Sequence, residues 1–383
     1  MTFLALLAML LPTFLPIALF FFLRKKQQLA ARITLIIGVA LVVFISSLWI
    51  LAISGVNAKH DFQQIAHVLN NDLAIPEDLQ QQKYLLLGLA NTAEAFSKYV
   101  NEYPTQKGNI DTLFQTMITF VTNEENYPVV SNKRTWKNNV FYLTQLNIML
   151  NYYRLTTQRD TFQKINQKIS NFLSAQLIRS PYKHLHSFEN DKVYWTADNA
   201  QLLASLHQFD EINKTTNISK QAIGGWQLFC KKEMLYDNSQ LPCAAFTAKE
   251  KCREAPHGTQ LSATIAALST YDMAFAKKIW KQYKFHYKHG TLNVFATFDQ
   301  YHPQEIAPAY NKQNFHPLDG IQTQFATLKA AAVIGDKLTY LQMANQIWLQ
   351  NILDSKEEEK LSAEYRWKGF YEKAVVFCAE VSF

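Results

Sequence analysis

Two long uncharged apolar runs at the N-terminus constrain the fold more than any other feature of this chain. The first is Thr2–Leu23 and the second is Ile33–Val56. About 20 apolar residues are enough to cross the hydrocarbon layer of a membrane as a helix, because each residue adds about 1.5 Å. The two runs therefore predict a transmembrane hairpin with spans at about residues 3–23 and 33–56.

A basic segment, 24–32, joins the two spans and contains Arg24, Lys25, Lys26 and Arg32. Cytoplasmic loops are enriched in lysine and arginine, so this segment is expected in the cytoplasm and both termini on the other side. The competing interpretation is a signal peptide, but its positive charges normally precede the apolar run, whereas here they follow it. We expect an inner-membrane protein in which residues 1–57 contact the lipid bilayer and residues 58–383 form a periplasmic domain.

The composition of the remainder is that of a folded helical domain. Glycine is scarce, at 11 residues in 383, which argues against the many tight turns of a barrel or sandwich of strands. The net charge of +7 is spread along the chain and lies partly in the basic segment. A nucleic-acid partner would require a clustered basic face inside the cell, so we expect none.

Helices are predicted in pairs along the periplasmic domain. The apolar periodicity gives about twelve of them: 61–73, 76–103, 109–121, 138–155, 159–177, 197–209, 220–235, 259–271, 273–289, 318–334, 337–353 and 364–381. Alternating hairpins without the fixed period of a solenoid suggest an all-α toroid of inner and outer helices, an (α/α)6-type barrel. An irregular helical bundle is the alternative.

Two cysteines lie nine positions apart, at Cys243 and Cys252. A short hairpin closed by a disulfide fits this spacing and the oxidising side of the membrane, although two free thiols are the alternative. Cys230 and Cys378 are expected to be buried small apolar residues. No C-x-x-C spacing occurs, and the pairs His184/His186 and His286/His289 lack a carboxylate at ligand spacing, so we expect no metal and no cofactor.

Two segments are expected to border a binding cleft. Tyr194, Trp195, Asp198 and Asn199 open the helix that continues to Phe209, with Thr196 as its N-cap, and polar residues at a helix start are poor choices for a closed core. Residues 289–318 form an aromatic connection long enough to be a lid over a site or an interface with a partner subunit.

The order of several segments resembles the linalool dehydratase/isomerase family. These segments are 139–153 (NVFYLTQLNIMLNYY), 195–206 (WTADNAQLLASL), the hairpin with 256–259 (PHGT), Asp319-Gly320 and Gly335-Asp336. The resemblance implies an (α/α)6 barrel. It does not carry over the family's catalysis, because Gln145 stands where the family has a histidine, and Trp195 and Ala204 stand where it has cysteines. The chain resembles a divergent member.

Candidate site residues follow from their places at helix starts and in the two segments. The candidate acids and base are Asp198, His257, Asp319 and Glu364, and the candidate substrate-binding residues are Tyr194, Trp195, Asn199, Gln145, Asp299, Tyr301 and Tyr310. Paired carboxyl groups can act as general acid and base in glycoside cleavage or elimination, and aromatic rings can stack on a sugar. Each acid can alternatively be a helix cap or a surface carboxylate, and His257 a turn residue.

Two functional hypotheses remain open at this point. In the first, the barrel binds and processes a glycan or a small apolar alcohol-like molecule, as a lyase, isomerase or glycoside-active enzyme. In the second, it is a non-catalytic docking subunit of a cell-envelope complex, with a membrane protein or a second copy as partner. A deep pocket holding two acids supports catalysis, whereas a rim filled by side chains supports docking.

Overall fold

The computed structural model describes residues 16–24, 27–53, 56–188, 192–215, 218–236, 239–249, 252–291, 293–301, 323–354 and 366–383. Within these residues the chain is mostly helical and carries three small two-stranded sheets. The helical composition predicted from the sequence is confirmed. Of the predicted site residues, Asp319, Glu364 and Tyr310 lie outside the described residues.

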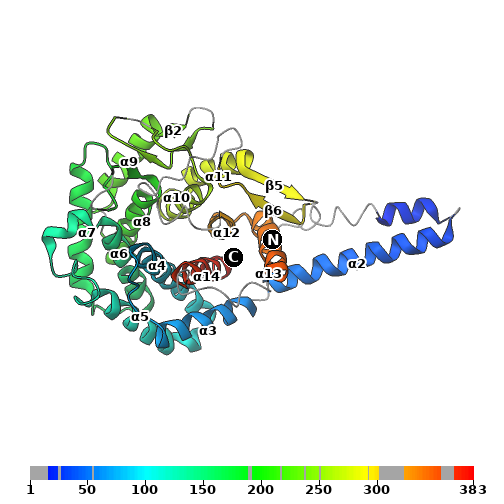
Figure 1. The fold of residues 1–383 in the computed structure, drawn as a ribbon, viewed down its shortest axis with the longest axis horizontal. Helices are drawn as coiled ribbons and strands as arrows, with labels where there is room; N and C mark the ends of the chain where they lie inside the picture. Colours follow the sequence, from blue (N-terminus) through cyan, green and yellow to red (C-terminus); the bar gives the residue numbers. More distant parts are fainter. Residues whose placement is uncertain are drawn as a thin grey trace.

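Six of the described helices, the central helices, pack in a closed circuit. They are α4 (Leu79–Glu102), α6 (Val140–Thr157), α8 (Thr196–Asn213), α10 (Gly258–Tyr271), α12 (Thr323–Ile334) and α14 (Arg366–Glu380). Each packs on the next along the chain, and α14 packs back on α4 (Figure 1). The last helix of the chain is therefore in contact with one of the first.

Six further helices, the peripheral helices, alternate with the central ones along the chain. They are α3 (Val56–Asn71), α5 (Lys107–Thr122), α7 (Gln163–Arg179), α9 (Lys220–Glu233), α11 (Met273–Tyr287) and α13 (Lys337–Asp354). Each packs on at least one central helix, for example α5 on α4 and α6, and α11 on α10 and α12. Short 3-10 turns, η1 (Pro104–Gln106) and η2 (Lys133–Asn138), precede α5 and α6.

The sequence explains which helices are central. In α6 the residues 140–147 are all buried, so this helix is enclosed on every side. In α9 only Ala222, Trp226 and Cys230 are buried, at intervals of four residues. A stripe at that spacing covers one face of a helix, so α9 can pack on one neighbouring layer and leave its other face to solvent.

Polar side chains fix several helix starts. Asp78 accepts a hydrogen bond from the backbone N–H of Gln81 at the start of α4, and Asp272 accepts one from Phe275 at the start of α11. Gly335 has a φ of +78°, which turns the chain sharply between α12 and α13. The expectation that Thr196 caps α8 is wrong. Thr196 is the first residue of the helix, and its hydroxyl donates a hydrogen bond of 2.6 Å to the carbonyl oxygen of Cys243.

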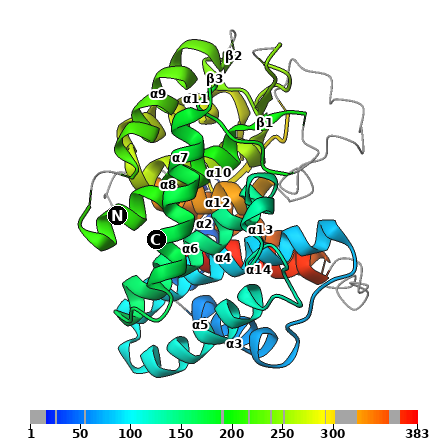
Figure 2. The ribbon, with the colours of Figure 1, turned by 90° about the vertical axis from the view of Figure 1, so that its left-hand side faces the viewer.

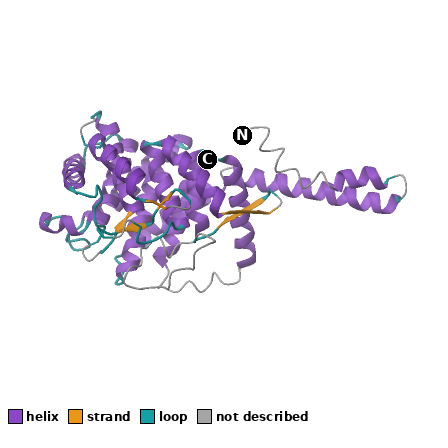
Figure 3. Cartoon of the chain, turned by 90° about the horizontal axis from the view of Figure 1, so that it is seen from above, coloured by secondary structure: helices purple, strands orange, loops and turns teal. Residues whose placement is uncertain are grey.

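One long apolar helix, α2 (Gln28–Ile53), extends away from the helical body (Figures 1 and 3). Its segment Gln28–Ser47 is long and apolar enough to cross a membrane, and only 17% of an 18-residue window within it is buried. Residues 16–23 form a helical segment that runs back along α2, because a Cβ on Gly38 would lie 3.3 Å from Ile17. Most of the other predicted span, residues 3–15, lies outside the described part of the chain.

The strands are short and antiparallel. β1 (Tyr194–Trp195) pairs with β4 (Ala245–Phe246), and β2 (Leu235–Tyr236) with β3 (Leu241–Pro242). Figure 2 shows this group at one end of the body, away from α3 and α5.

The third sheet corrects a prediction for residues 288–298. They form the hairpin of β5 (Lys288–Thr291) and β6 (Phe295–Phe298), not a helix end and an open loop. Alternate side chains of β6 are buried against the neighbouring helices, and this period of two favours a strand.

Candidate functional site

A cavity of about 470 Å³ lies among the central helices, and every one of them contributes to its walls. The walls include Gln145 of α6, Gln201 of α8 and Ser262 of α10, and they extend past the ends of α10 and α14 to Met273 and Ser382. The cavity therefore extends from about the second turn of several of these helices to the C-terminal ends of α10 and α14. The sequence had led us to expect a site at their N-terminal ends instead.

Alanine side chains make room for this cavity. Seven of the lining residues are alanine: Ala90, Ala204, Ala263, Ala266, Ala267, Ala326 and Ala332. A methyl group extends so little from a helix that the centre of the circuit stays open. The volume of the cavity falls in the range of about 300–1,000 Å³ that is typical of pockets for small molecules.

Three charged side chains form one cluster in the cavity wall. Glu94 on α4 accepts hydrogen bonds from Lys98 Nζ and Lys329 Nζ, one to each carboxylate oxygen, both at 2.6 Å. Lys329 also donates to Asn91 Oδ1 at 2.7 Å, and Lys98 donates to Ser382 Oγ at 2.8 Å. The cluster thus joins α4 to α12 and to the end of α14.

Burial and charge pairing act in opposite directions on these three groups. Burial raises the pKa of Glu94, but the two lysines outweigh it and hold that pKa well below its usual range. Burial lowers the pKa of Lys98 and of Lys329, but the nearby Cys378 and Glu94 act in the opposite direction and leave both pKa values above their ordinary values. All three groups are charged at neutral pH, so they supply fixed charges rather than a proton donor and acceptor.

Neutral polar groups complete the wall. Gln145 donates to Gln201 Oε1 at 2.9 Å, which links the neighbouring helices α6 and α8 in the cavity wall. Tyr152 also lines the cavity, and burial raises its pKa well above the ordinary value, so its phenol stays protonated. Of the predicted site residues that the structure describes, only Gln145 lines this cavity.

The residues at the start of α8 are packed into the interior rather than along an open cleft. Asp198 is 6% exposed and accepts a hydrogen bond from the Ser187 hydroxyl, and Asn199 is 1% exposed. Asn199 donates to and accepts from the backbone of Leu185, at 3.0 and 2.8 Å. A small pocket beside Asp198 has no room for a water molecule.

Aromatic packing occupies the strand before α8. Trp195 is 1% exposed, and the Tyr194 ring stacks on His186 at 4.0 Å and on Phe246 at 4.9 Å. The rings that were expected to bind a substrate therefore contact the protein itself.

His257, Asp299 and Tyr301 lie near the start of α10. His257 is 4% exposed, pairs with Tyr301 through a β-bridge and packs edge-on against its ring at 5.0 Å. Asp299 binds His289 Nε2 at 2.6 Å, and both side chains are well exposed. Neither Asp299 nor Tyr301 lines the central cavity.

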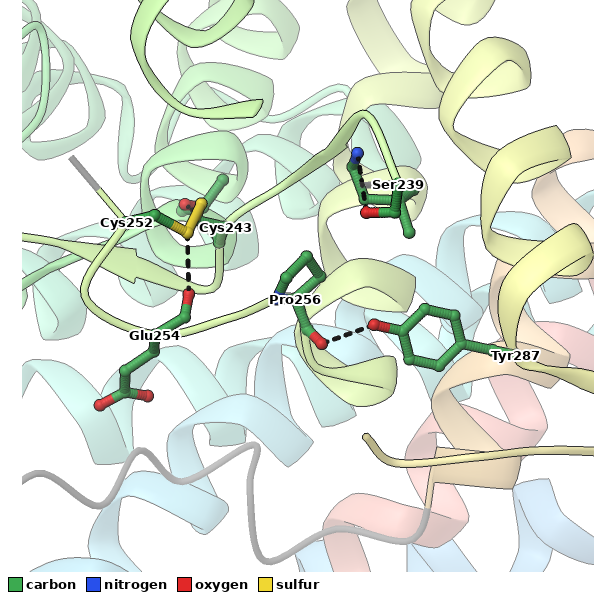
Figure 4. The surroundings of a disulfide bond; sticks show 8 residues. Ser239, Cys243, Cys252, Glu254, Pro256 and Tyr287 are labelled. Carbon is green, nitrogen blue, oxygen red and sulfur yellow. Dashed lines mark hydrogen bonds between the residues drawn. A yellow bond between two sulfur atoms is a disulfide. The ribbon is translucent and has the colours of Figure 1, made fainter. Parts of the chain in front are cut away.

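The predicted disulfide between Cys243 and Cys252 is confirmed, with Cα atoms 5.6 Å apart (Figure 4). The loop closed by the disulfide lies beside the starts of two central helices, α8 and α10. Thr196 of α8 donates to the Cys243 carbonyl, while Tyr287 of α11 donates to Pro256 just before α10, at 2.7 Å. The disulfide thus stabilises the segment that holds the starts of α8 and α10. Cys230 and Cys378 are free and buried, as predicted.

We did not predict the charged cluster from the sequence, although the pattern of charged residues in two helices indicates it. Lys329 is the one charged residue in the helix TQFATLKAAAVI, and Glu94 and Lys98 interrupt the buried face of α4 one turn apart. A charge within an otherwise buried helical face is rare unless it is paired. No group of three or more His, Cys, Asp or Glu side chains in the described residues could hold a metal ion.

Comparison of the sequence with family models and with curated proteins gives no match. The candidate site therefore rests on the geometry of this chain.

Proposed function

We propose that this protein is a membrane-anchored (α/α)6 barrel on the extracytoplasmic side of the membrane that binds a small organic molecule in its central cavity. The cavity of about 470 Å³ inside the circuit of central helices is the observation that carries the proposal. Helix α2 and the segment 16–23 packed against Gly38 support a transmembrane hairpin as the anchor.

The barrel assignment is supported by the strict alternation of central and peripheral helices along the chain. It is also the fold implied by the resemblance to the linalool dehydratase/isomerase family, which stays a prediction. Extracytoplasmic placement is supported by the basic segment between the apolar runs and by the disulfide, since disulfides persist in oxidising compartments.

The geometry favours binding over acid–base catalysis within the cavity. Glu94 is the one carboxylate among its described lining residues, and two lysines hold it ionised. Most glycosidases use two carboxyl groups with different protonation states. Asp198 and His257 do not line the cavity. The amide, hydroxyl and alanine surfaces suit a sugar unit or a small alcohol-like molecule.

A docking role is the second candidate, and the packed interior around Asp198 favours it. In that case the barrel presents a closed surface to a partner in the cell envelope, and the cavity has no ligand.

Filling the cavity tests the proposal. Small molecules released from full-length protein purified in detergent are identified by mass spectrometry for three forms: wild type, Ala266→Trp and Ala274→Trp. Ala266 lines the cavity, whereas Ala274 is exposed on α11 and does not. We expect wild type and Ala274→Trp to release the same compound and Ala266→Trp to release at least about tenfold less, because the indole occupies the space that the ligand needs.

Equal release from the two tryptophan variants would contradict binding in the cavity. A folded Ala266→Trp protein that still recovers an envelope partner, while wild type releases no compound, would favour docking.

A further inference from the structure

The charges in the cavity wall do not balance. Among the described lining residues, Lys98 and Lys329 are positive and Glu94 is negative, which leaves one excess positive charge. The side chains of all three are only partly exposed, at 29%, 14% and 17% respectively. A charge taken out of bulk water is costly unless an opposite charge compensates it.

The neighbouring titratable groups do not supply the missing negative charge. Burial raises the pKa of the Cys378 thiol and of the Tyr152 and Tyr371 phenols, so these groups stay neutral at pH 7. Burial and the nearby Asp61 raise the pKa of Glu380, at the end of α14, to about 9, so its carboxyl is neutral as well.

The cluster also leaves a hydrogen-bond donor for a ligand. An ammonium group has three N–H donors. Glu94 Oε1 and Ser382 Oγ take two of those of Lys98, at 2.6 and 2.8 Å. Lys98 lies in the last turns of α4, beside the part of the cavity that extends past the ends of α10 and α14.

We infer that the cavity binds a singly charged organic anion, a small carboxylic acid or acidic sugar, whose carboxylate contacts Lys98 and compensates the excess charge of the Lys98–Glu94–Lys329 cluster. This inference rests on the proposed function and specifies its ligand class. The polar and alanine surfaces farther from Lys98 then contact the uncharged part of the ligand.

A competing explanation assigns the lysines a structural role. The hydrogen bonds of Lys98 and Lys329 to Glu94, and of Lys98 to Ser382, join α4 to α12 and to the end of α14, and this joining alone would explain why both lysines are present. In that case the cavity has no preference for acids over neutral molecules of the same size.

Two matched pairs of water-soluble probes separate these explanations: glucuronate against glucose, and 6-hydroxyhexanoate against 1,6-hexanediol. Binding to the full-length protein in detergent is measured by ligand-observed NMR and calorimetry. We expect at least one acid to bind about tenfold or more tighter than its neutral partner, because one favourable charge interaction in a partly buried site is at least that large. We expect Lys98→Gln to abolish the difference without weakening the neutral probe.

Lys284→Gln is the matched control, because Lys284 is similarly exposed and pairs with Asp336 at 2.5 Å outside the cavity. It should retain the preference for the acid. Acids that bind no better than their neutral partners, including the case in which no probe binds, would overturn the inference. Binding that Ala266→Trp leaves unchanged would place the probes outside the cavity and overturn the proposed function as well.

Discussion

At the residue scale, the molecule depends on a few polar side chains placed where the sequence is otherwise apolar. Glu94 holds two ammonium groups on different helices, each at 2.6 Å. Removing one partner of a buried ion pair costs more than the pair itself contributes, because a charge is left without compensation.

We predict that Glu94→Gln lowers the free energy of unfolding by about 3–5 kcal/mol, since Lys98 and Lys329 would then face each other without a carboxylate. Guanidinium unfolding of the full-length protein measures the change. Glu77→Gln, at an exposed position before α4, is the control and should change stability by less than about 0.5 kcal/mol. Equal effects of the two substitutions would show that Glu94 does not offset the charges of Lys98 and Lys329 as described.

His184 is buried in a neutral form. It is 1% exposed, its Nδ1 lies 2.9 Å from the Tyr182 carbonyl, and Trp226 donates to its Nε2 at 2.9 Å. Burial lowers its pKa from 6.5 to about 3, although the hydrogen bond to Tyr182 acts in the opposite direction. Between these two values the unfolded chain binds a proton that the folded chain does not.

The contribution of the neutral His184 to the free energy of unfolding should therefore be complete above about pH 6.5 and decrease as the pH falls towards 3. We predict that His184→Gln reduces this dependence, so that the loss of unfolding free energy between about pH 7 and pH 4.5 is smaller than in wild type. His67→Gln, at an exposed position on α3, should leave the dependence unchanged. The same acid loss in all three proteins would assign the pH dependence to other groups.

At the element scale, the contact between α4 and α14 closes the circuit of central helices, and a glycine permits it. A Cβ added at Gly88 would lie 2.5 Å from the Phe370 ring and 3.3 Å from Tyr371 Cα. A Cβ at Gly224 on α9 would meet nothing within 4 Å. The two glycines occupy helix interiors, where alanine is intrinsically favoured by up to about 1 kcal/mol.

We predict opposite signs for the same substitution at these two positions. Gly88→Ala should destabilise the protein by about 1–3 kcal/mol, because the added methyl group forces α4 and α14 apart. Gly224→Ala should stabilise it by as much as about 1 kcal/mol. Thermal and denaturant unfolding measure both, and a stabilising Gly88→Ala would mean that the helices approach less closely than described.

At the scale of the whole molecule, the proposed function depends on the side of a membrane on which the helical body lies. Helix α2 is joined to α3 within a few residues, so the body begins next to the end of the apolar helix. We predict that alkaline phosphatase fused after Phe383 is active in intact bacterial cells, because a basic segment between two apolar runs is expected to remain in the cytoplasm.

The same reporter fused after Gln27, within the basic segment, should be inactive and serves as the control. A green fluorescent protein fused after Phe383 that fluoresces strongly would place the body in the cytoplasm and contradict the proposed location.

Sequence alone determined the apolar helix, the alternation of helices and the disulfide, because these depend on local composition, periodicity and spacing. Most predicted helix boundaries lie within a few residues of those in the structure. The prediction for residues 288–298 was wrong because the alternation of buried and exposed side chains in β6 depends on its packing against α13.

Only the tertiary structure decided which polar residues share the central cavity. Glu94 and Lys329 are 235 positions apart in the chain and meet only because α14 returns to α4 and closes the circuit. Asp198 and Asn199 look suited to an open cleft in the sequence, yet Ser187 and Leu185 satisfy their hydrogen bonds in the interior. Periodicity reports which face of a helix is buried, but it does not report whether that face meets other side chains or an open cavity.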